Sequence, residues 1–256
     1  MSPFVIATIF VSVVLTSFIS GILGMAGGMI LMGVLLALLP LTQAMLLHGM
    51  VQMAANGWRA WLWRAHIAWP ATRYYILGAL LALGALMLLR LVVSKPVGFI
   101  VIGCTPFITM LLPKKMVLNI DKPTHAGFCG LASSCLQLTG GVSGPVLDSF
   151  FIHSALNKHG IVATKAITQS FGHMLKIAYF GGFASIISST ATPTSAPIAP
   201  WIIIIAVALA FVGTNLSRRI LDGLDEAKFR SYTRTVISVI GAGYLTAGLL
   251  MLLNSN

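Results

Sequence analysis

Long apolar segments separated by short polar gaps dominate the chain. They cover residues 3–39, 43–63, 73–93, 96–112, 124–157, 160–183, 197–217 and 231–253. A helix needs about 20 mainly apolar residues to cross the hydrocarbon layer of a bilayer. No gap between the segments is long enough to hold a soluble domain. The pattern predicts an all-α, multi-pass integral membrane protein with about eight helical segments in one transmembrane domain, residues 1–256.

The first and fifth segments are too long for one crossing and contain clustered helix breakers. These are Gly21, Gly24, Gly27 and Gly28 in the first segment, and Gly140, Gly141, Gly144 and Pro145 in the fifth. Glycine lowers helix propensity, and proline removes a backbone donor. Broken backbone at membrane depth persists only where it is buried in protein or lines a polar cavity. We therefore expect both segments to be broken or re-entrant and to mark a site, although glycines also allow close helix packing.

The two halves of the chain match each other at a single offset. A shift of 117 residues aligns Gly24 with Gly141, Gly27 with Gly144, His48 with Lys165, Gln52 with Gln169, Asn56 with His173 and Arg59 with Lys176. Two glycine breaks and four successive polar positions at one offset indicate an internal duplication. We therefore predict two homologous halves, residues 1–113 and 122–256.

The composition separates this chain from soluble basic proteins. Only 8% of its residues are charged, and 57% are apolar, whereas a soluble domain carries about 25% charged residues. Its net charge of +11 would suggest nucleic-acid binding in a soluble protein. Here the basic residues fall mostly in short gaps between apolar segments, as in cytoplasmic loops of membrane proteins. We expect a lipid bilayer as its surroundings, and no nucleic acid as a partner.

The basic residues also indicate how the halves are oriented. They lie mainly in residues 59–73, 114–122, 158 and 218–234, with Arg90 and Lys95 as exceptions. All four groups reach the cytoplasmic side together if the first and fifth segments are re-entrant, which leaves three crossings in each half. An odd number of crossings inverts the second half. An inverted repeat is therefore preferred to eight plain crossings with parallel halves.

Two polar stripes point to the chemistry of the site. The stripe of the second segment is His48, Gln52, Asn56 and Arg59, and that of the sixth is Lys165, Gln169, His173 and Lys176. On a helix such spacing occupies an arc of roughly 80°. A charge at the bilayer centre costs about 2.5 to 3.5 kcal/mol, which makes Lys165 the sharpest candidate. Arg59 and Lys176 could instead snorkel to the headgroups, and the two glutamines could bond neighbouring helices.

Asp148 is the one acidic residue inside an apolar segment, close to the second break. It could neutralise Lys165, accept a coupling proton or cap a helix end. With His173 it is a candidate for proton coupling. Freed N–H groups at the helix breaks favour an anion. The candidate substrate-binding residues are Gly24, Gly27, Gly28, His48, Gln52, Asn56, Gly141, Ser143, Gly144, Lys165 and Gln169.

Three stretches resemble a known family. They are GILGMAGGMI (21–30), GGVSGPVLDSFF (140–151) and ATKAITQSFGHMLKIAYF (163–180), which look like the TauE/SafE sulfite exporter family of bacterial membrane proteins. The resemblance implies a secondary transporter that exports small sulfur-containing anions, such as sulfite, sulfoacetate or other organosulfonates, across the inner membrane with proton coupling. Family members usually have a denser first glycine cluster followed by a proline, whereas here the next proline is Pro40.

Two other functions remain open. Residues 141–144 spell G-x-S-G, so Ser143 with His173 could form an intramembrane serine hydrolase. A passive anion channel would suit the same polar stripes. We expect no enzyme activity, because Ala26 stands at the counterpart of Ser143 in the first half and a hydrolase has no need of a duplicated polar stripe. We expect no cofactor and no metal, because Cys104, Cys129 and Cys135 follow no metal or redox spacing. The expected partners are a small anion, protons and lipid, and a homodimer remains open.

Overall fold

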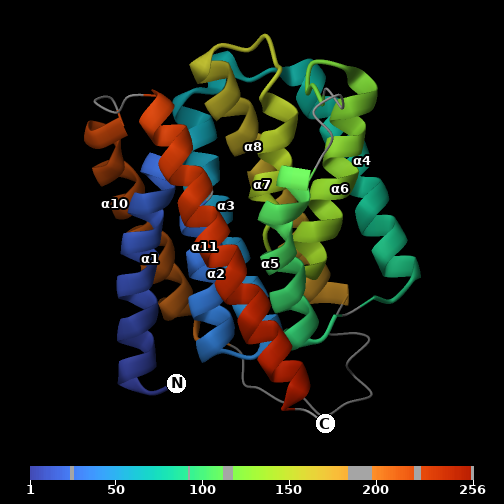
Figure 1. The fold of residues 1–256 in the computed structure, drawn as a ribbon. Coiled ribbons are helices and arrows are strands. Elements are labelled where there is room, and N and C mark those ends of the chain that lie inside the picture. Colours follow the sequence, from blue (N-terminus) through green and yellow to red (C-terminus); the bar gives the residue numbers. More distant parts are fainter. Residues whose placement is uncertain (24–25, 92, 112–117, 184–197, 222–225, 255–256) are drawn as a thin grey trace.

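The computed structural model describes residues 1–254 except 24–25, 92, 112–117, 184–197 and 222–225; side chains are described for these residues except 23, 109, 158, 218–221 and 226–234. This part of the chain is all helical (Figure 1). Its helices are α1 (Pro3–Leu23), α2 (Ala26–Leu38), α3 (Leu41–Leu62), α4 (Trp69–Leu88), α5 (Lys95–Leu111), α6 (Pro123–Thr139), α7 (Gly144–Phe151), α8 (Lys158–Ala178), α10 (Pro200–Leu221) and α11 (Glu226–Leu253). A 3-10 turn, η1 (Arg64–His66), follows α3, and a π-helical turn, η2 (Tyr179–Phe183), follows α8.

Local sequence signals explain where several helices begin. Pro70, Pro123 and Pro145 lie in the first turns of α4, α6 and α7, where the missing proline N–H has no helical partner to lose. The Asn157 side chain caps α8 by accepting a hydrogen bond of 2.8 Å from the Gly160 N–H. These signals end the long apolar segments at defined positions and separate α6 from α7 and α7 from α8.

The helices are interrupted at both glycine clusters. Helix α1 ends at Leu23 and α2 begins at Ala26, while α6 ends at Thr139 and α7 begins at Gly144. Helix α2 starts directly against α1, because a Cβ atom on Gly27 would lie 1.9 Å from the Thr16 carbonyl oxygen. Gly141 has φ of +87°, a left-handed conformation that glycine adopts without strain. The predicted site residue Gly24 lies outside the described residues.

Four helices in the described residues are long and apolar enough to cross a membrane. They are Pro3–Ile22, Trp69–Leu88, Pro200–Ser217 and Thr235–Leu253. Helices α3 and α8 have comparable lengths, 22 and 21 residues, but carry the polar stripes. They pack against each other in the interior, so their polar side chains need not face lipid. The all-helical prediction is confirmed for the described residues.

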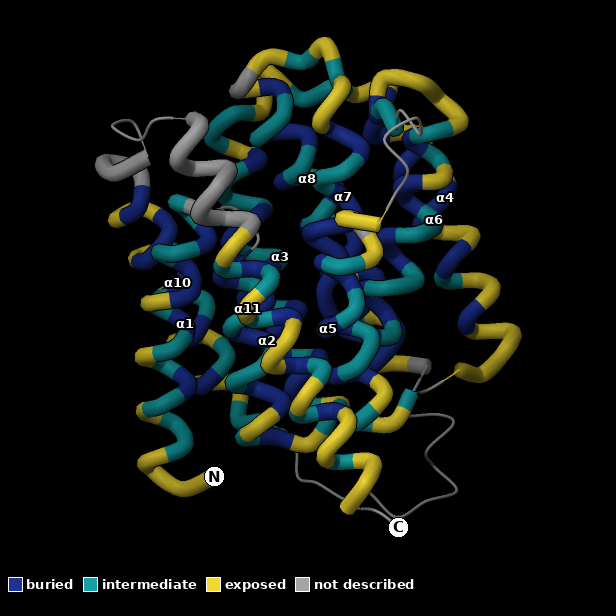
Figure 2. Tube along the Cα trace, in the orientation of Figure 1, coloured by how far each residue is buried: buried dark blue, intermediate teal, exposed yellow. Residues whose placement is uncertain are grey.

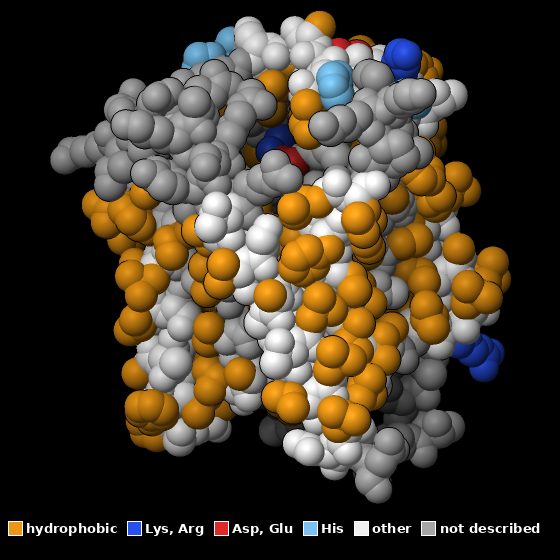
Figure 3. Space-filling view, viewed as in Figure 1, with side chains coloured by type: hydrophobic (Ala, Val, Ile, Leu, Met, Phe, Trp, Pro, Cys, Tyr) orange, Lys and Arg blue, Asp and Glu red, His pale blue; other side chains and the backbone are white. Residues whose placement is uncertain are grey.

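The surface of the bundle is apolar where a soluble protein would be polar. Buried residues line the inner sides of the helices (Figure 2). Large apolar side chains such as Leu81, Ile204 and Val239 are about two-thirds exposed, at 68%, 67% and 67%. Figure 3 shows apolar side chains over much of the described surface of one face, with histidine and basic side chains near its upper end and a further basic group lower on the right-hand edge. This distribution matches a protein whose outer surface contacts lipid at mid-height.

The bundle has two chemically different ends. At one end the Ala155 N–H donates to Asp121 at 2.7 Å and the Ala68 N–H donates to Thr164 at 2.9 Å, so the turns around residues 64–68, 119–123 and 151–158 lie together. At the opposite end Lys95 donates to the Leu39 carbonyl at 3.4 Å. The chain termini also lie at this second end (Figure 1). The turns of the first end are thus separated from Lys95.

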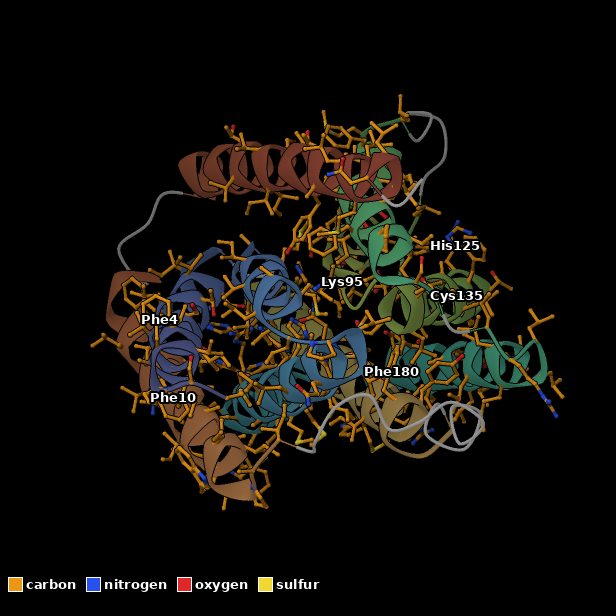
Figure 4. The ribbon with its side chains drawn as sticks, turned by 90° about the horizontal axis from the view of Figure 1, so that it is seen from below. Phe4, Phe10, Lys95, His125, Cys135 and Phe180 are labelled. Atoms are coloured by element: carbon orange, nitrogen blue, oxygen red, sulfur yellow. The ribbon has the colours of Figure 1, made fainter. Side chains whose placement is uncertain are left out.

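Pairs of helices distant in sequence pack closely through glycine. Helix α4 meets α6, α1 meets α10, α3 meets α8 and α5 meets α11. Figure 4, seen from below, places Phe4 and Phe10 of α1 on one side of the bundle and His125 and Cys135 of α6 on the other, with Lys95 and Phe180 between them. Helices α1 and α6 therefore lie apart.

The contact between α4 and α6 should depend on Gly78. A Cβ atom there would lie 1.9 Å from the Gly127 carbonyl oxygen, whereas a Cβ atom on Gly84 of the same helix meets nothing within 4 Å. We expect Gly78→Ala to lower the stability by about 1 to 3 kcal/mol, because α4 must move away from α6. Thermal unfolding of the purified protein in detergent would measure the loss. Gly84→Ala is the matched control, and equal melting temperatures for the two variants would contradict the close contact.

Candidate functional site

A polar cavity lies where α3 and α8 meet the two helix breaks. Its volume is about 20 Å³, and it is lined by Ser20, Gly28, Met29, His48, Gln52, Asn56, Gln137, Val142, Ser143, Gly144, Gln169 and His173. Residues from both halves of the chain contribute, including residues next to each break. The cavity is therefore the place where the two polar stripes and the two interruptions come together.

A buried lysine stands directly behind the wall of this cavity. Lys176 on α8 is 0% exposed. Its Nζ lies 2.7 Å from Nδ1 of His48 on α3 and donates to the Gly141 carbonyl oxygen at 3.0 Å. Gly141 can offer that oxygen because of its left-handed backbone. A Cβ atom there would also lie 2.9 Å from the sulfur atoms of Met32 and Met45.

The hydrogen bonds of His48 determine how its ring carries protons. Its Nε2 lies 2.9 Å from the Gly28 carbonyl oxygen, which only accepts, so Nε2 must carry a hydrogen. Nδ1 faces Lys176 Nζ, and only one proton fits on the line between these two nitrogens. The Lys176–His48 pair can therefore hold one positive charge, on the lysine or on the imidazole.

A second hydrogen-bond chain fixes His173. The Ser143 hydroxyl donates to Gln137 Oε1 at 2.7 Å, which turns the amide nitrogen of Gln137 towards His173. That nitrogen donates to Nδ1 of His173 at 2.8 Å. The hydrogen of the neutral His173 ring then lies on Nε2. The rings of His48 and His173 are 5.4 Å apart between centroids, so both belong to one cluster.

The amide nitrogen of Gln52 has no hydrogen-bond partner among the described residues. Gln52 is 4% exposed and lies against Gly28, where an added Cβ atom would approach the amide nitrogen to 3.2 Å. An unsatisfied buried donor costs about 1 to 3 kcal/mol. A hydrogen-bond acceptor that enters the cavity would therefore satisfy the amide nitrogen of Gln52. The N-terminus of α7, at Ser143 and Gly144, lies at the same wall.

The structure brings most of the predicted substrate-binding residues together. Those that line the cavity are Gly28, His48, Gln52, Asn56, Ser143, Gly144 and Gln169, with the predicted coupling residue His173. The carbonyl oxygen of Gly141 accepts a hydrogen bond from Lys176, which also contacts His48 of the cavity wall. Asn56 also accepts a hydrogen bond of 3.2 Å from Arg59. Gly27 lies against α1 and is not part of the lining.

Lys165 and Asp148 have a different position from the one expected. They form an ion pair between α8 and α7, with 22% and 33% of their side chains exposed, and neither lines the cavity. Asp148 thus neutralises Lys165, which was one of its three predicted roles. The buried cation next to the cavity is Lys176, and its complete burial rules out the alternative that it snorkels to the headgroups.

Two cavity residues were missed that the repeat could have supplied. Gln137 and Ser20 both line the cavity, and they correspond to each other at the offset of 117 residues. They precede the glycine breaks, whereas the polar stripes follow them. Extending the alignment by one helical turn before each break would have found the pair.

The geometry does not assemble a serine hydrolase. Ser143 donates to Gln137, and Gln137 also bonds His173, so Gln137 occupies the place of a direct bond between nucleophile and base. The described part of the chain also contains no group of three or more histidine, cysteine, aspartate or glutamate side chains suited to a metal.

The model of the sulfite exporter TauE/SafE family matches residues 9–244, which is nearly the whole chain. No curated protein and no solved structure matches the chain. The matched range includes both helix breaks, all twelve lining residues of the cavity and Lys176. The resemblance of the three sequence stretches is therefore confirmed, and the chain belongs to the sulfite exporter TauE/SafE family.

Proposed function

We propose that this protein is a secondary-active transporter that binds a small sulfur-containing anion in the cavity. Sulfite, sulfoacetate and other organosulfonates are the proposed substrates, exported across the bacterial inner membrane with proton coupling. The observation that carries the proposal is the wall of the cavity, where the Lys176–His48 pair lies near the unpartnered amide of Gln52. Membership of a transporter family supports transport as the class of function.

The chemistry of the wall favours an oxyanion. A sulfite or sulfonate group presents oxygen atoms that accept hydrogen bonds and share a negative charge. The cavity offers the complementary groups: the amide of Gln52, the ring of His173 and the helix end at Ser143. Of the two acidic side chains that the structure describes, Asp148 pairs with Lys165 and Asp121 accepts from Ala155. Neither competes with an anion for the Lys176–His48 pair.

The helix packing supports an inverted repeat. At the offset of 117 residues α3 corresponds to α8, and these helices run antiparallel, since Gly49 approaches Lys176 while Gly57 approaches Ser170. Helices α5 and α11, the last of each half, also run antiparallel, because Ile100 lies near Gly248 and Gly103 near Gly241. Equivalent elements in opposite directions are expected when halves are related by an axis in the membrane plane.

The remaining contacts support the same relation. Helix α1 packs on α10 and α6 packs on α4, so each first helix of a half lies against the fourth helix of the other half. We propose that α1 with α2, and α6 with α7, are the two re-entrant units, and that the substrate changes sides by alternating access, with the cavity open to one end of the bundle at a time. Both termini at one end of the bundle agree with this topology (Figure 1).

We propose that the ion pair of Asp148 and Lys165 holds α7 against α8. The counterparts of these residues in the first half are Leu31 and His48, so the pair has no equivalent there. His48 instead contacts Gly28 and Lys176. The two halves thus differ at this position. The Asp148–Lys165 ion pair could close the site on the side of the second half, and the contacts of His48 could close it on the side of the first half.

Replacing the buried cation tests the site. We expect Lys176→Met to weaken sulfite binding by at least about 30-fold, because removing one partner of a buried charged contact costs about 2 to 5 kcal/mol. Binding to purified protein and flux into proteoliposomes would measure the effect. Lys122→Met, at an exposed lysine, is the control. Unchanged binding by Lys176→Met would remove the proposed site, and flux that never accumulates substrate against its gradient would favour a passive channel.

Gln52 gives a test that separates binding from folding. We expect Gln52→Leu to lower sulfite affinity about tenfold, because a hydrogen bond to a charged group contributes about 1.5 to 3 kcal/mol. The thermal stability of the empty protein should stay equal or rise, since an unsatisfied buried amide is removed. Gln52→Glu keeps the shape and should abolish binding by repulsion. A large loss of stability in Gln52→Leu with normal affinity would instead assign Gln52 a structural role.

A further inference from the structure

We propose that the Lys176–His48 pair is the proton-binding site of the transporter, and that it takes up one proton together with each anion, so that export carries the two together and is driven by the gradient of the anion and not by an inward proton gradient. This inference rests on the proposed function, because it needs an anion in the cavity. It assigns the coupled proton to a pair of bases contributed by both halves of the chain, and not to Asp148, which is already paired with Lys165.

The empty pair is satisfied without the extra proton. A neutral Lys176 amine has two N–H groups, which match its two acceptors, His48 Nδ1 and the Gly141 carbonyl oxygen. A charged ammonium has a third N–H group. The two contacts of Lys176, with His48 and with Gly141, provide no acceptor for this third group. Both contacts are uncharged, and the side chain is 0% exposed. Since an isolated charge in such a place is costly, the proton is held only when a negative charge arrives.

His48 connects this proton to the cavity. Its ring lines the cavity, while its Nδ1 faces Lys176 at 2.7 Å and its Nε2 donates to Gly28 at 2.9 Å. A proton on the shared line therefore places positive charge on the imidazole or immediately behind it. An anion in the cavity stabilises either form. The Gly28 contact also keeps a second new proton off the ring, because Nε2 already carries its hydrogen.

The other ionisable groups around the pair do not compete for this proton. His173 on the same helix accepts at Nδ1 from Gln137 of α6, and its ring is 5.4 Å from His48. A charge on His173 would therefore repel the charge on the pair. Tyr75 of α4 lies close to Gly172, Tyr179 of η2 donates to the Leu91 carbonyl, and Lys165 is neutralised by Asp148 of α7. The cluster accordingly accepts one proton.

Anion and proton binding are then linked in both directions. If a bound anion raises the affinity of the pair for a proton by some factor, a bound proton raises the affinity of the cavity for the anion by the same factor. If one proton enters with each anion, anion affinity rises about tenfold for each unit by which the pH falls, in the range where only the loaded pair is protonated. A site with a permanent charge would show no such slope.

The test uses purified protein and methanesulfonate, whose own charge is constant across roughly pH 6 to 9. Binding should strengthen as the pH falls, and a weakly buffered solution should become more alkaline by one proton per bound anion. Lys176→Arg carries a permanent charge, so it should bind methanesulfonate with a flat pH profile and no proton uptake. His159→Gln, at an exposed histidine, should behave as the wild type does.

The outcomes separate the two proposals. Binding of methanesulfonate or sulfite at equal affinity across this pH range, without proton uptake, would overturn the coupling proposal and leave the anion site standing. No binding of either anion at any pH would overturn both. Loss of proton uptake in Asp148→Asn would move the coupling to the Asp148–Lys165 pair. If Lys176→Arg does not fold, proton uptake by the wild type still decides the question.

Discussion

One nitrogen atom, Lys176 Nζ, joins three separate parts of the molecule. It belongs to α8, lies 2.7 Å from a histidine of α3 and donates to the carbonyl at the break between α6 and α7. A fully buried amine needs these partners, and they in turn need defined neighbours: Gly141 must be left-handed, and His48 must bond Gly28. The two polar helices and both glycine breaks are therefore positioned around a single group that water and lipid do not reach.

The rest of the bundle makes this interior possible. Close contacts at glycines such as Gly78 bring the outer helices together at van der Waals distance, which is how membrane helices associate when no hydrophobic force acts between them. The outer surface stays apolar, and the hydrogen-bonding groups are gathered at the centre. Alternating access would change the contacts around the cavity while these outer helix pairs, each of which joins one helix from each half, stay together.

Much of this organisation could be predicted from the sequence. Apolar length and clustered glycines predicted the helix segments and their interruptions, and the offset of 117 residues predicted the two helices whose polar side chains line the cavity. Family membership was visible in three short stretches and is confirmed over residues 9–244. These features are encoded locally, as runs, breaks and repeats, so they can be read without knowing how the helices cross.

The choice between the two lysines of the sixth segment could not be made in this way. Lys165 and Lys176 lie on one stripe, yet they are separated by about 16 Å along a helix that rises 1.5 Å per residue. Which of them reaches the cavity depends on where α3 crosses α8, and crossing geometry is set by packing. The contact of Gly49 with Lys176 places the crossing near the end of the stripe, which leaves Lys165 to Asp148.

The most direct test of the account is the position of an anion. Selenite is a heavier analogue of sulfite, and its selenium atom can be located by anomalous scattering in crystals of this protein. The account predicts a selenium peak in the cavity, within hydrogen-bonding reach of the Gln52 amide and beside the His48 ring. A peak only at Lys165 or at the basic end of the bundle, with the cavity empty at saturating selenite, would contradict it.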